Sequence, residues 1–192
     1  MKSLSDLWKA YDKNNLGFQE LKDLSWHIEN DEDPQAAIGM ATDIGLANLG
    51  PVIAKHLDHP DVCIRSFTLG CLVGRLKLSE YAQKAFSMAS SDPDEGVRST
   101  AISCLGSVLK KLDKPLQQEI ASYIYHVIIS KKYDNWLRSS AYDAINRAME
   151  IPPHKRRSLG IKNFDYQVDY NFLENFCQNY KVLMAKQEHT QV

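Results

Sequence analysis

The stretch Asp92–Leu112, DPDEGVRSTAISCLGSVLKKL, decides the fold, because a copy of it lies 33 residues upstream within His59–Leu76, HPDVCIRSFTLGCLVGRL. The matched pairs are Pro60 and Pro93, Asp61 and Asp94, Ile64 and Val97, Arg65 and Arg98, Ser66 and Ser99, Cys71 and Cys104, and Leu72 and Leu105. Periods of this length are typical of stacked supersecondary units, since one unit alone cannot bury its apolar face. The sequence therefore predicts a repeat protein.

A third copy of the unit follows further along the chain, in Asp134–Met149. Its Leu137, Arg138, Ser139, Ala141, Ala144 and Ile145 match Val97, Arg98, Ser99, Ala101, Cys104 and Leu105 at an offset of 40 residues. No stretch alternates apolar and polar residues for long enough to require a strand, so we predict an all-α fold. The expected helices are a first one capped by Ser3, then Phe18–Ile28, Pro34–Asn48, Val52–Leu57, Pro60–Leu76, Ser79–Ser90, Pro93–Leu112, Pro115–Ile129, Asp134–Met149 and Tyr170–Ala185.

The expected organisation is a single domain over residues 1–192. We divide it into N-terminal helices (1–32), repeats (33–150), a C-terminal cap (151–185) and a frayed tail (186–192). Pro152-Pro153 ends the repeats, and the aromatic-rich segment after it is expected to cover the last repeat, because the ends of stacked repeats must be shielded from water. The last residues of a chain are often frayed.

Composition and charge restrict the classes of partner. With 44% hydrophobic residues and a formal net charge of −1, the 192-residue chain resembles ordinary globular proteins and has no basic surplus for neutralising phosphates. This disfavours nucleic acid as a partner. Asp6 and Trp8 interrupt the N-terminal stretch where a signal peptide needs an apolar run, and no run is long enough to span a membrane. We therefore expect a cytoplasmic protein that contacts no membrane.

Residues that could bind metals or form disulfides are few. The cysteines number four, namely Cys63, Cys71, Cys104 and Cys177. Their spacing fits no ligand cluster, so we expect reduced core thiols. His56 and His59 lie three residues apart but lack the further ligands that a closed zinc site needs. We predict no metal and no cofactor.

The repeated pattern Pro-Asp-x-x-(Ile/Val)-Arg resembles that of the HEAT-repeat family. The residues that carry the resemblance are Pro60, Asp61, Ile64 and Arg65, then Pro93, Asp94, Val97 and Arg98, and, without the proline, Asp134, Leu137 and Arg138. This resemblance implies an α-α superhelix of stacked antiparallel hairpins that holds other macromolecules along its second helices. The whole chain, including Val168–Leu173, is also similar to the immunity proteins that neutralise bacterial toxins.

Each repeat places an Asp four residues before an Arg, so the two charges are neighbours on a helix. We expect Asp61 with Arg65, Asp94 with Arg98, and Asp134 with Arg138 to form a structural ladder. The chain has no Gly-rich phosphate loop, no serine nucleophile elbow and no His-Glu-x-x-His helix, so we predict that it is not an enzyme. Because some HEAT-like proteins are DNA glycosylases or bilin lyases, two alternatives stay open: a HEAT-like nucleic-acid-binding protein or DNA glycosylase, and a small-molecule or chromophore scaffold.

The binding surface is expected on the face of the second helices that points away from the core. The residues predicted to form it are Ser66, Lys77, Glu95, Ser99, Ser103, Lys110, Ser139, Asp143 and Asn146. Gly70, Ser103 and Asp143 occupy one equivalent position that differs between the copies. The acidic turn Glu29–Asp33 could attract a basic partner. The sequence thus predicts a protein-binding scaffold, with a toxin domain as the partner that it neutralises by covering the active site.

Overall fold

The computed structural model describes residues 1–157 and 159–183, and over these residues it contains helices and turns but no strand. This confirms the predicted all-α fold. The helices are α1 (Leu4–Asp12), α2 (Phe18–Asn30), α3 (Gln35–Ile44), α4 (Gly50–Ala54), α5 (Val62–Leu69), α6 (Ala82–Ser91), α7 (Glu95–Val108), α8 (Lys114–Ile129), α9 (Asn135–Ala148), α10 (Phe164–Gln167) and α11 (Tyr170–Tyr180). The expected frayed tail, 186–192, lies outside the described residues.

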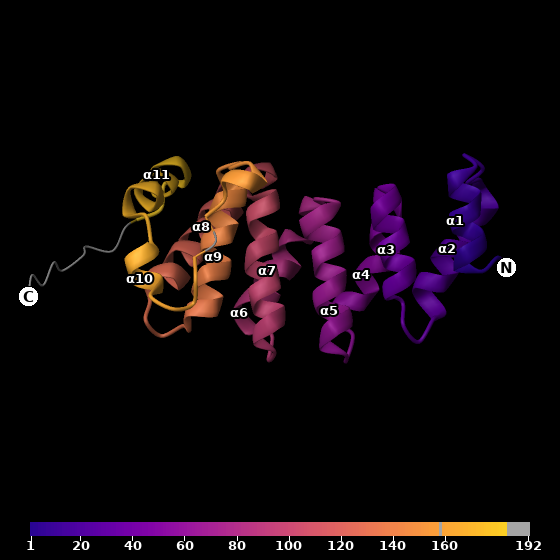
Figure 1. Cartoon of the computed structure of the whole chain (residues 1–192), viewed down its shortest axis with the longest axis horizontal. Coiled ribbons are helices and arrows are strands. Elements are labelled where there is room, and N and C mark those ends of the chain that lie inside the picture. Colours follow the sequence, from indigo (N-terminus) through magenta and orange to yellow (C-terminus); the bar gives the residue numbers. More distant parts are fainter. Residues whose placement is uncertain (158, 184–192) are drawn as a thin grey trace, which may run out of the picture.

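The helices follow one another along the long axis of the molecule (Figure 1). Helices α3, α5, α7 and α9 form one row, in which each contacts the next, and we call them the second helices. Helix α2 packs on α3, α6 on α7, and α8 on α9, so a further layer of helices covers one side of this row. A π-helical segment, Gly70–Arg75, continues α5 toward the upper end of the molecule in Figure 1.

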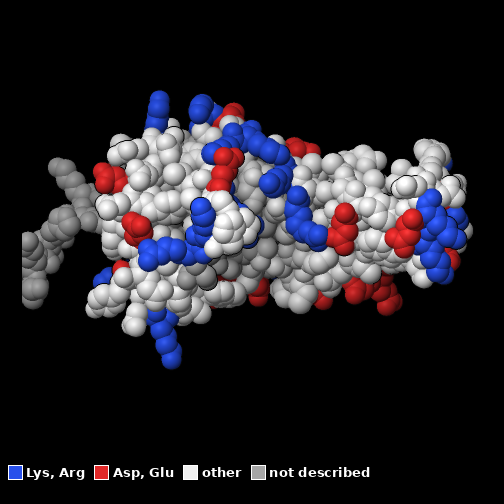
Figure 2. All heavy atoms as spheres, turned by 45° about the horizontal axis from the view of Figure 1, so that its top comes forward, with Lys and Arg blue, Asp and Glu red and all other residues white. Residues whose placement is uncertain are grey.

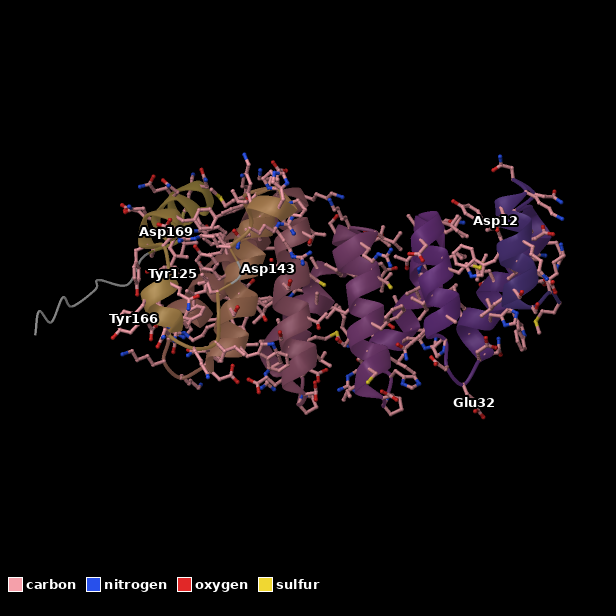
Figure 3. All side chains as sticks on the ribbon, viewed as in Figure 1. Asp12, Glu32, Tyr125, Asp143, Tyr166 and Asp169 are labelled. Carbon is pink, nitrogen blue, oxygen red and sulfur yellow. The ribbon has the colours of Figure 1, made fainter. Side chains whose placement is uncertain are left out.

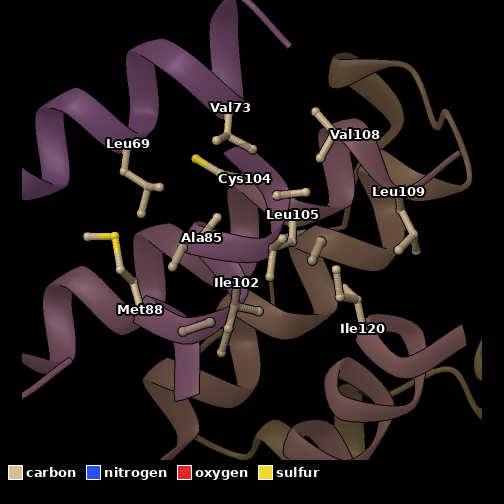
Figure 4. Close-up of a cluster of buried hydrophobic side chains, with 14 of the residues drawn as sticks. Leu69, Val73, Ala85, Met88, Ile102, Cys104, Leu105, Val108, Leu109 and Ile120 are labelled. Atoms are coloured by element: carbon tan, nitrogen blue, oxygen red, sulfur yellow. The ribbon is translucent and has the colours of Figure 1, made fainter. Parts of the chain in front are cut away.

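The apolar side chains of both layers meet in one continuous core. Figure 4 shows Leu69 and Val73 from α5 and its π-helical continuation, Met88 from α6, Ile102 from α7 and Ile120 from α8 packed together. Burial of each such large apolar side chain contributes about 1.5–3 kcal/mol to folding. The helical spacing of these residues places them on one face of each helix, and their burial holds the row together.

Three of the second helices, α5, α7 and α9, are capped at their N-termini by aspartates. The side chains of Asp61, Asp94 and Asp134 accept hydrogen bonds from the backbone N–H groups of Cys63, Val97 and Leu137, respectively. An N-cap carboxylate satisfies a backbone donor that has no partner within the helix. The expected helix starts at Pro60 and Pro93 are therefore two residues too early, because each proline lies in the turn before the capping aspartate.

Two of the three repeat arginines form ion pairs with carboxylates further along the chain, but not with the expected partners. Arg65 donates from Nε and Nη2 to the carboxylate of Asp92, at 3.1 and 3.0 Å, and so joins its repeat to the next one. Arg138 forms the corresponding ion pair with Asp165, again 27 residues further along the chain. The predicted pairs within one helix are wrong, because the aspartate of each pair caps the helix. Arg65 and Arg98 donate instead to carbonyls of the turn before their helices, and Arg138 donates to the carbonyl of Ile128 in α8.

The segment after α9 lies against the exposed side of that helix. Ser139 Oγ donates to the carbonyl of Leu159 at 2.8 Å, and Asn135 Nδ2 donates to the carbonyl of Ile161 at 2.9 Å. The guanidinium of Arg138 lies 4.4 Å from the centre of the Phe164 ring. Helix α11 then packs on α8. The end of the row is thus covered by the chain itself.

Candidate functional site

A groove lies over α7, with α5 on one side and α9 on the other. Its volume is about 460 Å³. The lining residues are Phe67, Gly70, Cys71, Gly74, Arg75, Ser99, Thr100, Ser103, Cys104, Ser140 and Arg147. Most of these side chains are small, so the groove owes its depth to missing side-chain volume, and its walls belong to three helices that the core holds in place.

Two glycines of the π-helical segment, Gly70 and Gly74, explain why the groove is open on the side of α5. A Cβ added to Gly70 would meet no atom within 4 Å, so the space beside this glycine belongs to the groove. At Gly74 the added Cβ would lie 3.0 Å from Sγ of Cys104, so α7 can approach closely there. π-helical turns are rare and occur frequently at functional sites.

The hydroxyl groups of the row bond across neighbouring helices. Ser99 Oγ lies 2.6 Å from Ser140 Oγ, and Ser103 Oγ donates to Asp143 at 2.7 Å. Asp143, which Figure 3 shows on α9 in the body of the row, also accepts a hydrogen bond of 2.7 Å from Nε of Arg147. These side chains therefore form a polar seam that fixes α7 against α9 along the groove.

Five of the predicted binding residues lie in or beside this groove. Ser99 and Ser103 line it, and Asp143 is bonded to Ser103. Lys77 and Lys110 line an adjoining hollow of about 150 Å³. The expectation that Ser99 points away from the protein is wrong, because its side chain turns toward α9 and is only 7% exposed.

The other four predicted residues line neither the groove nor the adjoining hollow. Ser66 bonds Thr100 between α5 and α7 at 2.8 Å, and Ser139 lies under the segment after α9. Glu95 lies at the opposite end of α7, where a hydrogen bond with Asp134 raises the pKa of Glu95. The predicted outward direction of Asn146 is wrong, because this side chain is 3% exposed and donates to backbone carbonyls.

The sequence reasoning missed several residues of the groove, namely Gly74, Arg75, Thr100, Ser140 and Arg147. One signal was present: Gly70 and Gly74 lie four residues apart in a helical stretch, where glycine is unfavourable by about 1 kcal/mol relative to alanine. Two glycines on one helix face indicate either an open space or the close approach of another helix. Here Gly70 borders the open space of the groove, and Gly74 permits the close approach of α7.

The acidic turn before α3 lies at the lower ends of the second helices. Figure 3 shows Glu32 at its tip. Glu29 pairs with Lys55 at 2.5 Å, and Asp31 accepts from His27 at 3.0 Å, so both have partners within the chain. Attraction of a basic partner to this turn stays a prediction.

The cysteines yield a test of the core packing. Cys63 is exposed, whereas Cys71, Cys104 and Cys177 are buried. Burial raises the pKa of Cys104 to about 12 and that of Cys177 to about 11, so these thiols hold their protons at neutral pH. We expect a maleimide to label only Cys63 in the native protein, as measured by mass spectrometry. The Cys63→Ser variant should take up no label until it is unfolded in urea; rapid labelling of this folded variant would contradict the described packing.

Metal sites and membrane spans are not found in the part of the chain that the structure describes. No cluster of three His, Cys, Asp or Glu side chains could hold a metal ion there. Within the same residues, no helix has the length and apolarity needed to cross a lipid bilayer. The chain gives no match to protein-family models, to curated proteins or to solved structures.

Proposed function

We propose that this chain is a non-enzymatic, HEAT-like α-solenoid that binds a protein through the groove over α7. The position of the groove carries the proposal: it lies across three successive second helices, on the surface that the HEAT resemblance implies for binding. Because the walls are helices held by a common core, the groove needs little ordering when a partner binds, which lowers the cost of association.

The partner in this proposal is a toxin domain, which the chain neutralises by covering its active site. This choice rests on the sequence resemblance to immunity proteins alone. Occlusion requires no chemistry from the binding protein, only a rigid surface that complements the partner.

The polar groups of the groove favour binding over catalysis. The hydroxyls of Ser99 and Ser103 are bonded to Ser140 and Asp143, and Arg147 holds the same Asp143 carboxylate. A carboxylate paired with a guanidinium is a poor base for activating a serine, and no histidine is among the described residues that line the groove.

The test is to produce in cells the protein encoded by the adjacent gene, which the proposal expects to be the toxin, with and without this chain. We expect co-production of this chain to restore growth, and the two purified proteins to form a complex. Gly70→Trp should fill the groove from a position with free space around it and abolish rescue, whereas Gly70→Ala should rescue like the wild type.

Both variants should keep the wild-type circular dichroism and should not melt below the wild type. Full rescue by Gly70→Trp would contradict the groove as the binding surface. If the chain instead binds duplex DNA with an affinity that falls steeply with salt, the nucleic-acid-binding alternative would be favoured.

A further inference from the structure

The charge of the molecule is unevenly distributed along the second helices. Lys77, Lys110, Arg147 and Arg156 line the hollow of about 150 Å³ at the C-terminal ends of α5, α7 and α9, and we call these four residues the basic rim. Figure 2, which brings these ends forward, shows Lys and Arg gathered over the middle of the molecule with only scattered Asp and Glu. The formal net charge of −1 conceals this local surplus.

The basic rim is continuous with the groove. Gly74 and Arg147 line both the hollow and the groove, so the two form one depression along α7. From Ser99 to Lys110, along α7 and the 3-10 turn after it, the chain rises by about 17 Å, at roughly 1.5–2 Å per residue. An extended peptide of about five residues covers that length, at roughly 3.3 Å per residue.

The cations of the rim are only partly neutralised. Lys110 pairs with Glu150 at 2.7 Å, and Arg147 pairs with Asp143 at the same distance. Among the described residues, no carboxylate forms an ion pair with Lys77 or Arg156. Cations near helix C-termini are favoured by the helix dipole, which explains why the fold tolerates them together. Their surplus charge remains available to an anion.

We propose that the groove and the basic rim together bind an extended acidic segment of a protein partner. Its carboxylates lie at Lys77 and Arg156, and its small side chains lie in the groove beside Ser103. The proposal rests on the proposed function and specifies the chemistry of the partner. Within the chain itself, Lys110 and Arg147 already bind carboxylates at 2.7 Å, which is the contact that the segment would form.

Nucleic acid fits the depression less well than an acidic peptide. Phe67 is the aromatic residue that lines the groove, and its side chain is half-buried, so the described lining provides no platform on which bases could stack.

The experiment measures fluorescence anisotropy with a labelled peptide of alternating Glu and Ser residues. We compare the wild type with the Lys77→Glu, Arg156→Glu double variant. The matched control is Lys131→Glu with Lys132→Glu, which makes the same charge change in the exposed turn before α9. We expect roughly tenfold weaker binding by the rim variant, unchanged binding by the control, and loss of affinity as salt rises.

Other results would overturn the inference. Equal binding by the rim variant and the wild type would do so, as would a higher affinity for a single-stranded or duplex oligonucleotide than for the peptide. If the toxin binds the rim variant as tightly as the wild type, the inference fails and the proposed function stands. If the acidic peptide binds at the rim while no toxin is bound, the proposed function fails instead. Circular dichroism checks that both variants fold.

Discussion

Replacing Gly106 by alanine is expected to lower the free energy of unfolding by about 3 kcal/mol or more. A Cβ at this position would lie 2.2 Å from the carbonyl oxygen and 2.6 Å from the Cα atom of Ala144. Overpacking a core typically costs about 1–3 kcal/mol when side chains can move aside. Here the obstacle is backbone, so α7 and α9 must separate, and the seam from Ser103 to Asp143 is stretched with them.

Gly70→Ala is the matched control for this prediction, because it adds the same methyl group to the row of second helices where no atom lies within 4 Å. Alanine is favoured over glycine in a helix by about 0.5–1 kcal/mol, so this variant should be as stable as the wild type or slightly more so. Urea unfolding followed by circular dichroism measures both. Equal midpoints for Gly106→Ala and the wild type would refute the close approach of α7 to α9.

The sequence predicted the local elements of the fold well, since they depend on short-range chemistry. The helical spacing of apolar residues located the second helices, and the Pro-Asp pairs located their starts to within two residues. The close contact at Gly106 could not be predicted, because the equivalent position holds Val73 in one copy and Asn146 in another. Such a contact depends on how two helices approach each other, which the repeat pattern does not specify.

The candidate site was predicted only in part, for the same reason. Ser99 and Ser103 belong to the groove, but their hydroxyls turn toward α9, since a partner from the next repeat satisfies each of them. Ser139 and Asn146 bond instead to the segment after α9, whose path has no counterpart in the repeats. The net charge of −1 likewise could not indicate the basic rim, because it sums the charges of the whole chain. The four cations of the rim come together only through the packing of the folded helices.

The ladder between repeats gives the second large effect, since Arg65→Met is expected to lower the free energy of unfolding by about 2–4 kcal/mol. Removing one partner of a buried ion pair costs about 3–5 kcal/mol, because the other charge is left buried alone. The side chains of Arg65 and Asp92 are 11% and 7% exposed. Because water still reaches the pair and weakens the interaction, we expect the loss of unfolding free energy to lie somewhat below that range. Methionine retains most of the volume of the arginine stem, so the effect reports the lost charge and hydrogen bonds.

Arg98→Met is the control that isolates the ion pair, because Arg98 occupies the same repeat position. Both arginines donate from Nη1 to two carbonyls of the preceding turn, but in the described chain only Arg65 also holds a carboxylate. We therefore expect Arg98→Met to cost about 1–2 kcal/mol, as for the loss of ordinary hydrogen bonds. Thermal and urea unfolding of the two variants side by side measure the difference. Equal losses would show that the carbonyl contacts, and not the Asp92 carboxylate, join the repeats.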